Sequence, residues 1–175
     1  GDETIKSSKD IKSLVDEKIV QYNTLSLEKF GRNFRYSKFV KEIDEADTSI
    51  ISNETSLIMQ KRITPTTGKE KSYTIKFENP IFHPHDGHMP VVTSSKFTFT
   101  KTDGTTVDVF LEDDGNGKLR MYEYKDEVKN YISENSGSVD YEKGILTLEK
   151  FNPTDVENTI LLFDCIPENK DLLSE

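Results

Sequence analysis

The three histidines of the chain fall in one short segment, at His83, His85 and His88, with Asp86 between the last two. Imidazole nitrogens and carboxylate oxygens are ligands that Zn²⁺ accepts, and three of them with a water would complete a tetrahedral site. Such a zinc would activate its water for hydrolysis. The spacing matches no established metal motif, however, and the proline and glycine residues of the segment suit a turn. We therefore expect a solvated or contact loop, with a metal-dependent hydrolase or metal-binding module as the alternative.

A second segment, residues 112–123, is similar to a calcium-binding loop. Glu112, Asp114 and Asn116 occupy its positions 1, 3 and 5, Gly117 occupies position 6, and Glu123 occupies position 12. The first position is normally Asp, and the flanking residues are typical of strands where an EF-hand requires helices. Asp-Gly and Asn-Gly steps are also the residues that a tight hairpin needs. The sequence therefore predicts a hairpin here, with a calcium-stabilised adhesion module as a further alternative.

Other catalytic patterns are missing from the sequence. No serine lies in a Gly-x-Ser-x-Gly elbow, and no glycine-rich phosphate loop is present. The single cysteine, Cys165, has no histidine near it in sequence, and its apolar neighbours predict a buried strand residue. We accordingly predict a protein that is not an enzyme and needs no cofactor.

Residues 30–51 combine an apolar stripe with two charged groups. Tyr36, Phe39, Val40 and Ile43 are spaced as i, i+3, i+4 and i+7, which places them on one face of a helix. The basic residues are Arg32, Arg35, Lys38 and Lys41, and the acidic ones are Glu42, Asp44, Glu45 and Asp47. Cations therefore precede anions, which opposes the helix macrodipole unless groups outside the helix meet these charges.

We interpret this charge pattern as a surface that contacts another subunit. The residues predicted to make that contact are Arg32, Arg35, Lys38, Glu42, Asp44 and Asp47. Because a two-fold interface is self-complementary, both halves of the segment could serve one contact between identical chains.

The remaining periodicity predicts an α+β fold. Residues 11–22 have helical spacing, and Ser7, Ser8 or Asp10 could cap that helix. Strand patterns follow at 56–63, 73–77, 96–100, 107–111, 119–122, 139–148 (a hairpin) and 159–163, with turn signals between them. The turn signal at 102–105, Thr-Asp-Gly-Thr, predicts a further hairpin between the strands at 96–100 and 107–111. We expect a helical segment at 1–47, an antiparallel β-rich domain of about eight strands at 48–166, and a polar tail at 167–175.

Composition limits the possible partners. The 175-residue chain has a formal charge of −9 and a pI near 4.9, which argues against binding nucleic acid or anionic membranes. No apolar run reaches the roughly 20 residues of a transmembrane helix. The chain begins with Gly1 and shows no secretory signal, so we expect it to be a fragment of a longer protein.

Three segments resemble one family when they are taken together. These are FGRNFRYSKFVKEIDEADTSI at 30–50, LEDDGNGKLRMYEY at 111–124 and GSVDYEKGILTLEKFNP at 137–153. They are similar to the C-terminal part of the baseplate wedge protein of contractile-tailed, T-even-like bacteriophages, within the baseplate J-like family. The segment at 58–82 is similar in character, so the likeness extends over most of the chain from about residue 24 to residue 163.

The resemblance implies a structural role and carries over no catalytic residue. It implies a virion protein of the tail baseplate, assembled in the cytoplasm of the bacterial host, that forms a homodimer and contacts other wedge proteins. The histidine segment matches no motif of that family, so its role stays open.

Overall fold

The computed structural model describes residues 6–28 and 32–173. Phe30 and Gly31, which belong to the predicted junction between the helices, lie outside the described residues. The chain divides into two compact units: residues 1–56 with 170–175, and residues 57–169. The predicted α+β class is confirmed, because two helices precede a sheet that is antiparallel throughout.

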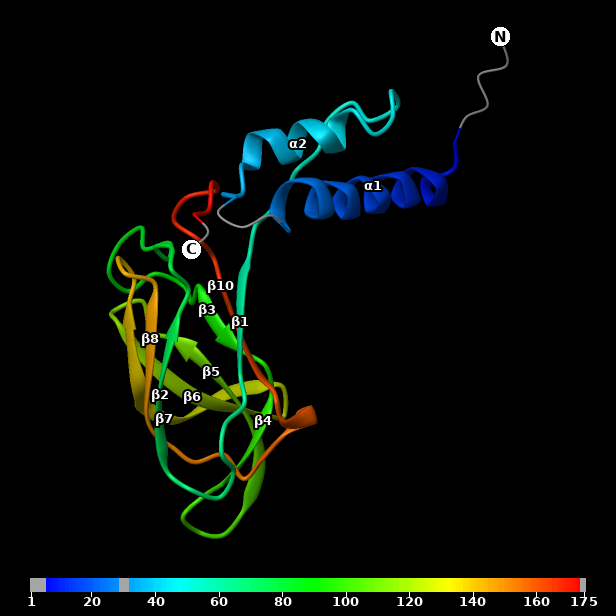
Figure 1. The fold of residues 1–175 in the computed structure, drawn as a ribbon. Helices are drawn as coiled ribbons and strands as arrows, with labels where there is room; N and C mark the ends of the chain where they lie inside the picture. The colour runs from blue at the N-terminus through cyan, green and yellow to red at the C-terminus, as the bar shows by residue number, and fades with distance from the viewer. Residues whose placement is uncertain (1–5, 29–31, 174–175) are drawn as a thin grey trace. The chain divides into compact units, whose positions relative to one another are not determined.

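The first unit contains helices α1 (Ser8–Tyr22) and α2 (Tyr36–Asp44), which lie side by side (Figure 1). Ser7 is the residue that caps α1. Its hydroxyl accepts from the Asp10 amide and the Asp10 carboxylate accepts from the Ser7 amide, which makes a capping box. A π-helical turn, η1 (Asn23–Leu27), continues α1. The rings of Tyr22, Phe34 and Phe39 pack together with centroids 5.2–6.0 Å apart.

The C-terminal residues complete this first unit. Phe34 and Leu172 form an isolated antiparallel bridge, in which the Leu172 amide donates to the Phe34 carbonyl at 3.0 Å. The segment predicted as a polar tail therefore supplies backbone and side-chain contacts to the helical unit.

The second unit is one ten-stranded sheet. Its strands are β1 (Met59–Ile63), β2 (Lys71–Lys76), β3 (Val92–Ser94), β4 (Phe97–Thr100), β5 (Thr106–Asp113), β6 (Lys118–Lys125), β7 (Val128–Asp140), β8 (Ile145–Phe151), β9 (Asp155–Val156) and β10 (Leu161–Cys165), with a 3-10 turn at Glu157–Thr159. The main order is β1-β10-β3-β5-β6-β7-β8-β2, and β4 pairs with β5 and β9. The end strands β1 and β2 also approach each other (Figure 1).

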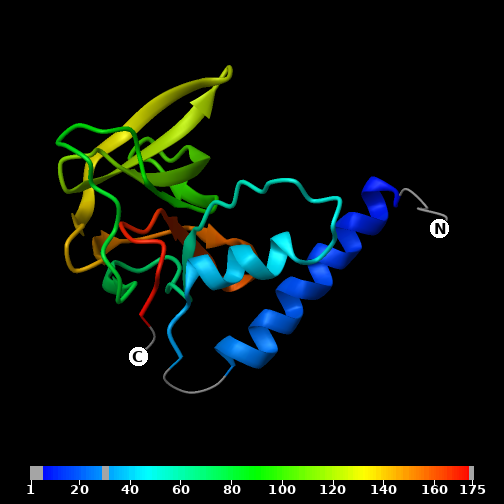
Figure 2. The ribbon, with the colours of Figure 1, turned by 90° about the horizontal axis from the view of Figure 1, so that it is seen from above.

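All three predicted hairpins are present. β4 and β5, β5 and β6, and β7 and β8 pair as sequence neighbours. The pattern did not predict β3, β9 or the first half of β7. Figure 2 shows β6 and β7 running side by side to their turn, where Asp126 and Glu127 both have positive φ without any glycine. The last strand begins later than predicted, since Asn158 and Thr159 also take positive φ.

The core of the second unit is formed mainly by side chains of the strands. Its fully buried side chains include Phe97, Val109, Leu111, Leu146 and Phe163. Cys165 is 1% exposed on β10, which confirms the predicted buried strand position, and burial raises the pKa of its thiol. Within the described residues, no helix is long and apolar enough to cross a membrane.

Candidate functional site

The apolar stripe of α2 faces inward and its charges face outward. Ile43 is buried, and Tyr36, Phe39 and Val40 are half-buried. The six residues predicted to contact a subunit are all described; Asp47 is half-buried, and the exposed ones are Arg32, Arg35, Lys38, Glu42 and Asp44. The structure thus leaves five of these six charged residues accessible to solvent.

Four of the six have partners within the chain. Arg35 pairs with Asp171 at 3.0 Å, and Glu42 lies 3.8 Å from Lys18. Asp44 accepts a hydrogen bond from Asn53. Asp47 pairs with Lys6, and this hydrogen bond holds the pKa of Asp47 well below its usual range. Among the described residues, Arg32 and Lys38 make no hydrogen bond or ion pair, so of the six they are the two cations available to a partner.

The N-terminus of α2 is capped from the far end of the sequence. Its N-cap residue, Arg35, provides no side-chain cap, but Asp171 accepts the Tyr36 amide at 2.8 Å. The charge opposition noted in the sequence is therefore offset by a carboxylate from residues 170–175. No local sequence signal pointed to Asp171.

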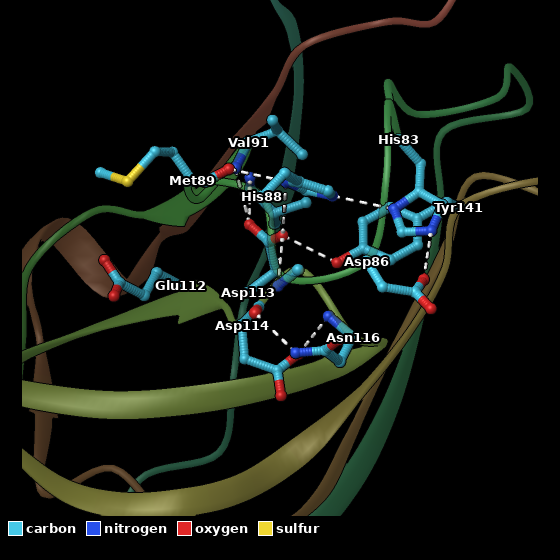
Figure 3. A network of polar contacts seen from close by, with 12 residues as sticks. His83, Asp86, His88, Met89, Val91, Glu112, Asp113, Asp114, Asn116 and Tyr141 are labelled. Carbon is cyan, nitrogen blue, oxygen red and sulfur yellow. Dashed lines mark hydrogen bonds and ion pairs between the residues drawn. The ribbon is translucent and has the colours of Figure 1, made fainter.

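Within the second unit, the histidine segment lies beside Asp113 (Figure 3). His88 donates from Nδ1 to the Met89 carbonyl at 2.7 Å, and its Nε2 lies 2.9 Å from Nδ1 of His83. His83 Nε2 lies 3.3 Å from Asp86 Oδ1. His85 is exposed, meets the Asp86 carbonyl through Nδ1, and lies edge-on to the His88 ring with centroids 6.3 Å apart. The three rings are therefore close, but their nitrogens bond to different partners.

This arrangement does not support the metal alternative. Within the described residues, no group of three or more His, Cys, Asp or Glu side chains is placed to hold a metal ion. The ring nitrogens of His88 are both engaged by His83 and Met89, and His85 points to its own neighbour. A zinc site at His83, His85, Asp86 and His88 is accordingly not favoured by the geometry.

Asp113 is the polar centre of this region and was not singled out from the sequence. It is fully buried, and its Oδ1 accepts the Val91 and Val92 amides, both at 2.7 Å. Its Oδ2 accepts the Tyr141 hydroxyl at 2.8 Å and the Gly115 amide at 3.3 Å. Burial first, and then this hydrogen bond to Asp113, raises the pKa of Tyr141. One carboxylate thus ties four donors from three parts of the chain together.

The calcium-like segment 112–123 is a hairpin with internal partners. Asp114 accepts the Asn116 and Lys118 amides through Oδ1, which closes the turn between β5 and β6. Glu112 is 2% exposed, and its carboxylate accepts hydrogen bonds from the side chains of Lys129 at 2.5 Å, Tyr131 at 2.7 Å and Arg120 at 3.2 Å. The predicted hairpin is confirmed, and the carboxylate that would begin a calcium loop is already neutralised by two cations.

The comparisons with known proteins bear on the N-terminal part of the chain. Residues 1–62 match a family model described as baseplate structural protein gp6, C-terminal domain III. This match covers 62 of the 175 residues and includes α1, α2 and most of β1. The hairpin segments at 111–124 and 137–153 lie outside it, and no curated protein matches the chain. The similarity supports a structural subunit of a phage baseplate.

Proposed function

We propose that the chain is part of a baseplate wedge protein that holds a phage tail baseplate together. It does so by pairing with a second copy of itself and by contacting other wedge proteins. The observation that carries this proposal is the match of residues 1–62 to a baseplate structural domain. The match is consistent with a non-enzymatic protein and with a place in the virion tail, after assembly in the host cytoplasm. The finer assignment to the baseplate J-like family belongs to the same proposal.

The surface of the helical unit supports a contact role. Arg32 and Lys38 are exposed cations that have no ion-pair partner within the described part of the chain. On α1, Val20 is 64% exposed beside a shallow groove that Asp16, Glu17 and Gln21 also line. Exposed apolar side chains flanked by charges are typical of protein contacts.

This distribution suits pairing between identical chains. In a two-fold interface, the same patch meets its own copy, so a unit that carries both signs of charge can pair its cations with the anions of the other chain. We assign Arg32 and Lys38 to the basic half and Asp16 and Glu17 to the acidic half. In this assignment, the surface around the two halves also includes the charges that have partners within the chain, which are Arg35, Glu42, Asp44 and Asp47.

Light scattering across a concentration series tests the pairing. We expect dimers that dissociate when Arg32→Glu and Lys38→Glu are combined in one chain, or when Asp16→Lys and Glu17→Lys are combined in another. In a dimer of either variant, like charges would face each other. An equimolar mixture of the two variants would restore both contacts and form heterodimers. Lys61→Glu with Lys125→Glu, two exposed cations of the second unit, is the matched control for the change in net charge.

Two results would contradict parts of the proposal. If the basic-half variant and the control behave alike, or if the mixture stays monomeric, the assigned surface is wrong. If the unmodified chain is also monomeric and captures no wedge protein in a pull-down with purified baseplate components, the assembly role itself fails.

A further inference from the structure

The hydrogen bonds of His88 determine where its protons lie. The Met89 carbonyl can only accept, so Nδ1 of His88 carries a hydrogen. In a neutral His88 ring, Nε2 is then bare and must accept from Nδ1–H of His83, 2.9 Å away. His88 has a side chain only 4% exposed, so water does not readily replace these partners.

Assigning the ring hydrogens in this way leaves a conflict at His83. If His83 donates through Nδ1 and is neutral, its Nε2 is bare and lies 3.3 Å from Asp86 Oδ1, which places two acceptors against each other. One additional proton on the pair removes the conflict, because every contact from Met89 to Asp86 then has one hydrogen. A second additional proton places a hydrogen on each of the two facing nitrogens and a positive charge on each ring. The hydrogen bond between His83 and His88 is then lost.

We propose that His83 and His88 are a shared-proton pair that fastens the loop at residues 83–90 and releases it when the pair takes up its second additional proton. The pair would therefore act as an acid-sensitive switch built from geometry, independent of the baseplate assignment. Two interacting rings of this kind take up their protons in two steps that belong to the pair. Histidine is the side chain suited to such a change near neutral pH.

Acidic groups surround the pair and provide counter-ions for its first additional proton (Figure 3). Asp113 Oδ2 lies 4.0 Å from His88 Nδ1, and the Tyr141 ring stacks on His83 with centroids 4.3 Å apart. The other titratable groups facing the pair are Asp86 and His85 on the loop, Asp114 beside Asp113, Glu142 next to Tyr141, and Glu168, whose Oε2 accepts the His83 amide.

The pair is one of few attachments of this loop. The Gly87 amide donates to the Gly115 carbonyl at 2.9 Å, and beyond the loop the Val91 amide is held by Asp113. Loss of the contact between His83 and His88 would leave the Gly87 bond to hold the loop tip against the β5–β6 turn. We therefore expect opening to be local, with the strands still paired.

Amide hydrogen exchange and histidine NMR on the intact chain test the switch. After correction for the intrinsic effect of pH, we expect exchange of the Gly87 amide, which donates to the Gly115 carbonyl, to rise at least about tenfold between about pH 7.5 and about pH 5. His83→Gln should abolish that rise, since its amide can donate to His88 without titrating. His85→Gln is the matched control and should keep the rise, because His85 is exposed and outside the pair.

Nitrogen-15 NMR of the imidazole rings in the unmodified chain provides a readout that does not depend on any variant. We expect His88 to carry its hydrogen on Nδ1, and the two rings together to hold one additional proton before the loop opens. Both rings titrating independently as Nε2–H tautomers would overturn the proposal. An unchanged pH response in His83→Gln, or equal exchange at both pH values in the unmodified chain, would overturn it as well.

Discussion

The carboxylate of Asp171 accepts a hydrogen bond from the Tyr36 amide at 2.8 Å, across 135 residues of sequence. Its other oxygen lies 3.0 Å from the guanidinium of Arg35, the N-cap residue of α2. One side chain therefore satisfies an unpaired amide at the start of the helix and meets the first of its cations. The charge pattern of α2, which is unfavourable within the helix, is compensated by residues from the C-terminal end of the chain.

Removing this carboxylate should weaken the helical unit. We expect Asp171→Ala to lower the helical signal in circular dichroism and the melting temperature by a few degrees. Asp171→Asn should have a smaller effect, since its oxygen can still accept the Tyr36 amide but carries no charge for Arg35. Glu54→Gln, an exposed acid of the same unit outside the proposed contact, is the control. Equal melting temperatures for all four proteins would contradict the capping role.

The contribution of Asp171 should also depend on pH. The hydrogen bond from Arg35, followed by that from the Tyr36 amide, holds the pKa of Asp171 below its ordinary value of 3.8. A lowered folded-state pKa gives stability that is present above the ordinary value and lost as the pH falls through the folded-state value. Melting curves of the unmodified chain and Asp171→Asn should therefore differ at neutral pH and converge in strong acid.

Asp113 should be among the most sensitive polar positions. Asparagine keeps one oxygen, so two of the four donors lose their acceptor, at about 1–3 kcal/mol each. We expect Asp113→Asn to lower the free energy of unfolding by about 2–5 kcal/mol in urea titrations. Tyr141→Phe removes one of the four bonds and should cost about 1 kcal/mol. A smaller loss for Asp113→Asn than for Tyr141→Phe would contradict this ranking.

Tyr141 should also make the fold sensitive to alkali. Burial, followed by the hydrogen bond to Asp113, raises the pKa of Tyr141 above its ordinary value of 10.0. Above pH 10.0 the unfolded chain loses this proton first, so stability falls as the pH rises toward the folded-state value. Tyr141→Phe should show a shallower decline over the same range. Identical slopes for both proteins would show that other groups control alkaline unfolding.

Glu112 and Asp108 lie on the same strand and provide a matched comparison. Glu112 is 2% exposed between Arg120 and Lys129, and Glu112→Gln would leave both cations short of their counter-ion. We expect a loss of about 1–3 kcal/mol in chemical unfolding. Asp108→Asn breaks only an exposed pair with Lys96 and should change little. Similar losses in the two variants would contradict the importance of burial.

Substitutions at two glycines distinguish the cost of backbone conformation from the cost of a steric clash. Gly104 has φ +84 with open space around it, so Gly104→Ala should cost only about 1 kcal/mol. Gly115 has φ +74, and an added Cβ would lie 2.6 Å from the backbone nitrogen and oxygen of His88. Gly115→Ala should therefore lower the free energy of unfolding by about 2 kcal/mol or more, as measured by chemical denaturation. Equal effects would show that the histidine loop does not pack against this turn.

The predictable part of the fold is the local part. Helical spacing at residues 36–43 and the capping residues near Ser7 predicted α2 and the start of α1, because those signals operate within a few residues. Turn residues such as Asp103 and Gly104 predicted hairpins for the same reason. The turn between β6 and β7 was missed, since Asp126 and Glu127 adopt positive φ where a glycine signal would be expected.

The candidate sites show where local signals stop. Sequence spacing grouped His83, His85 and His88, but in the fold His83 and His88 bond to each other, His85 bonds to Asp86, and His88 lies beside Asp113, 25 positions later in the chain. The residues predicted to contact a subunit divide into paired and unpaired charges, and that division depends on Lys6, Lys18 and Asp171. No pattern around those partners identifies them.

The sequence by itself determined the α+β class, the hairpins, the inward stripe of α2 and the acidic, lean composition, because hydrophobic periodicity and turn chemistry act over short distances. Only the tertiary structure decided which charges remain free, which histidines meet and which carboxylates are buried. Those outcomes depend on which side chains lie within hydrogen-bonding distance after folding. Chain segments such as Tyr36 and Asp171 reach that distance only when the whole unit has formed.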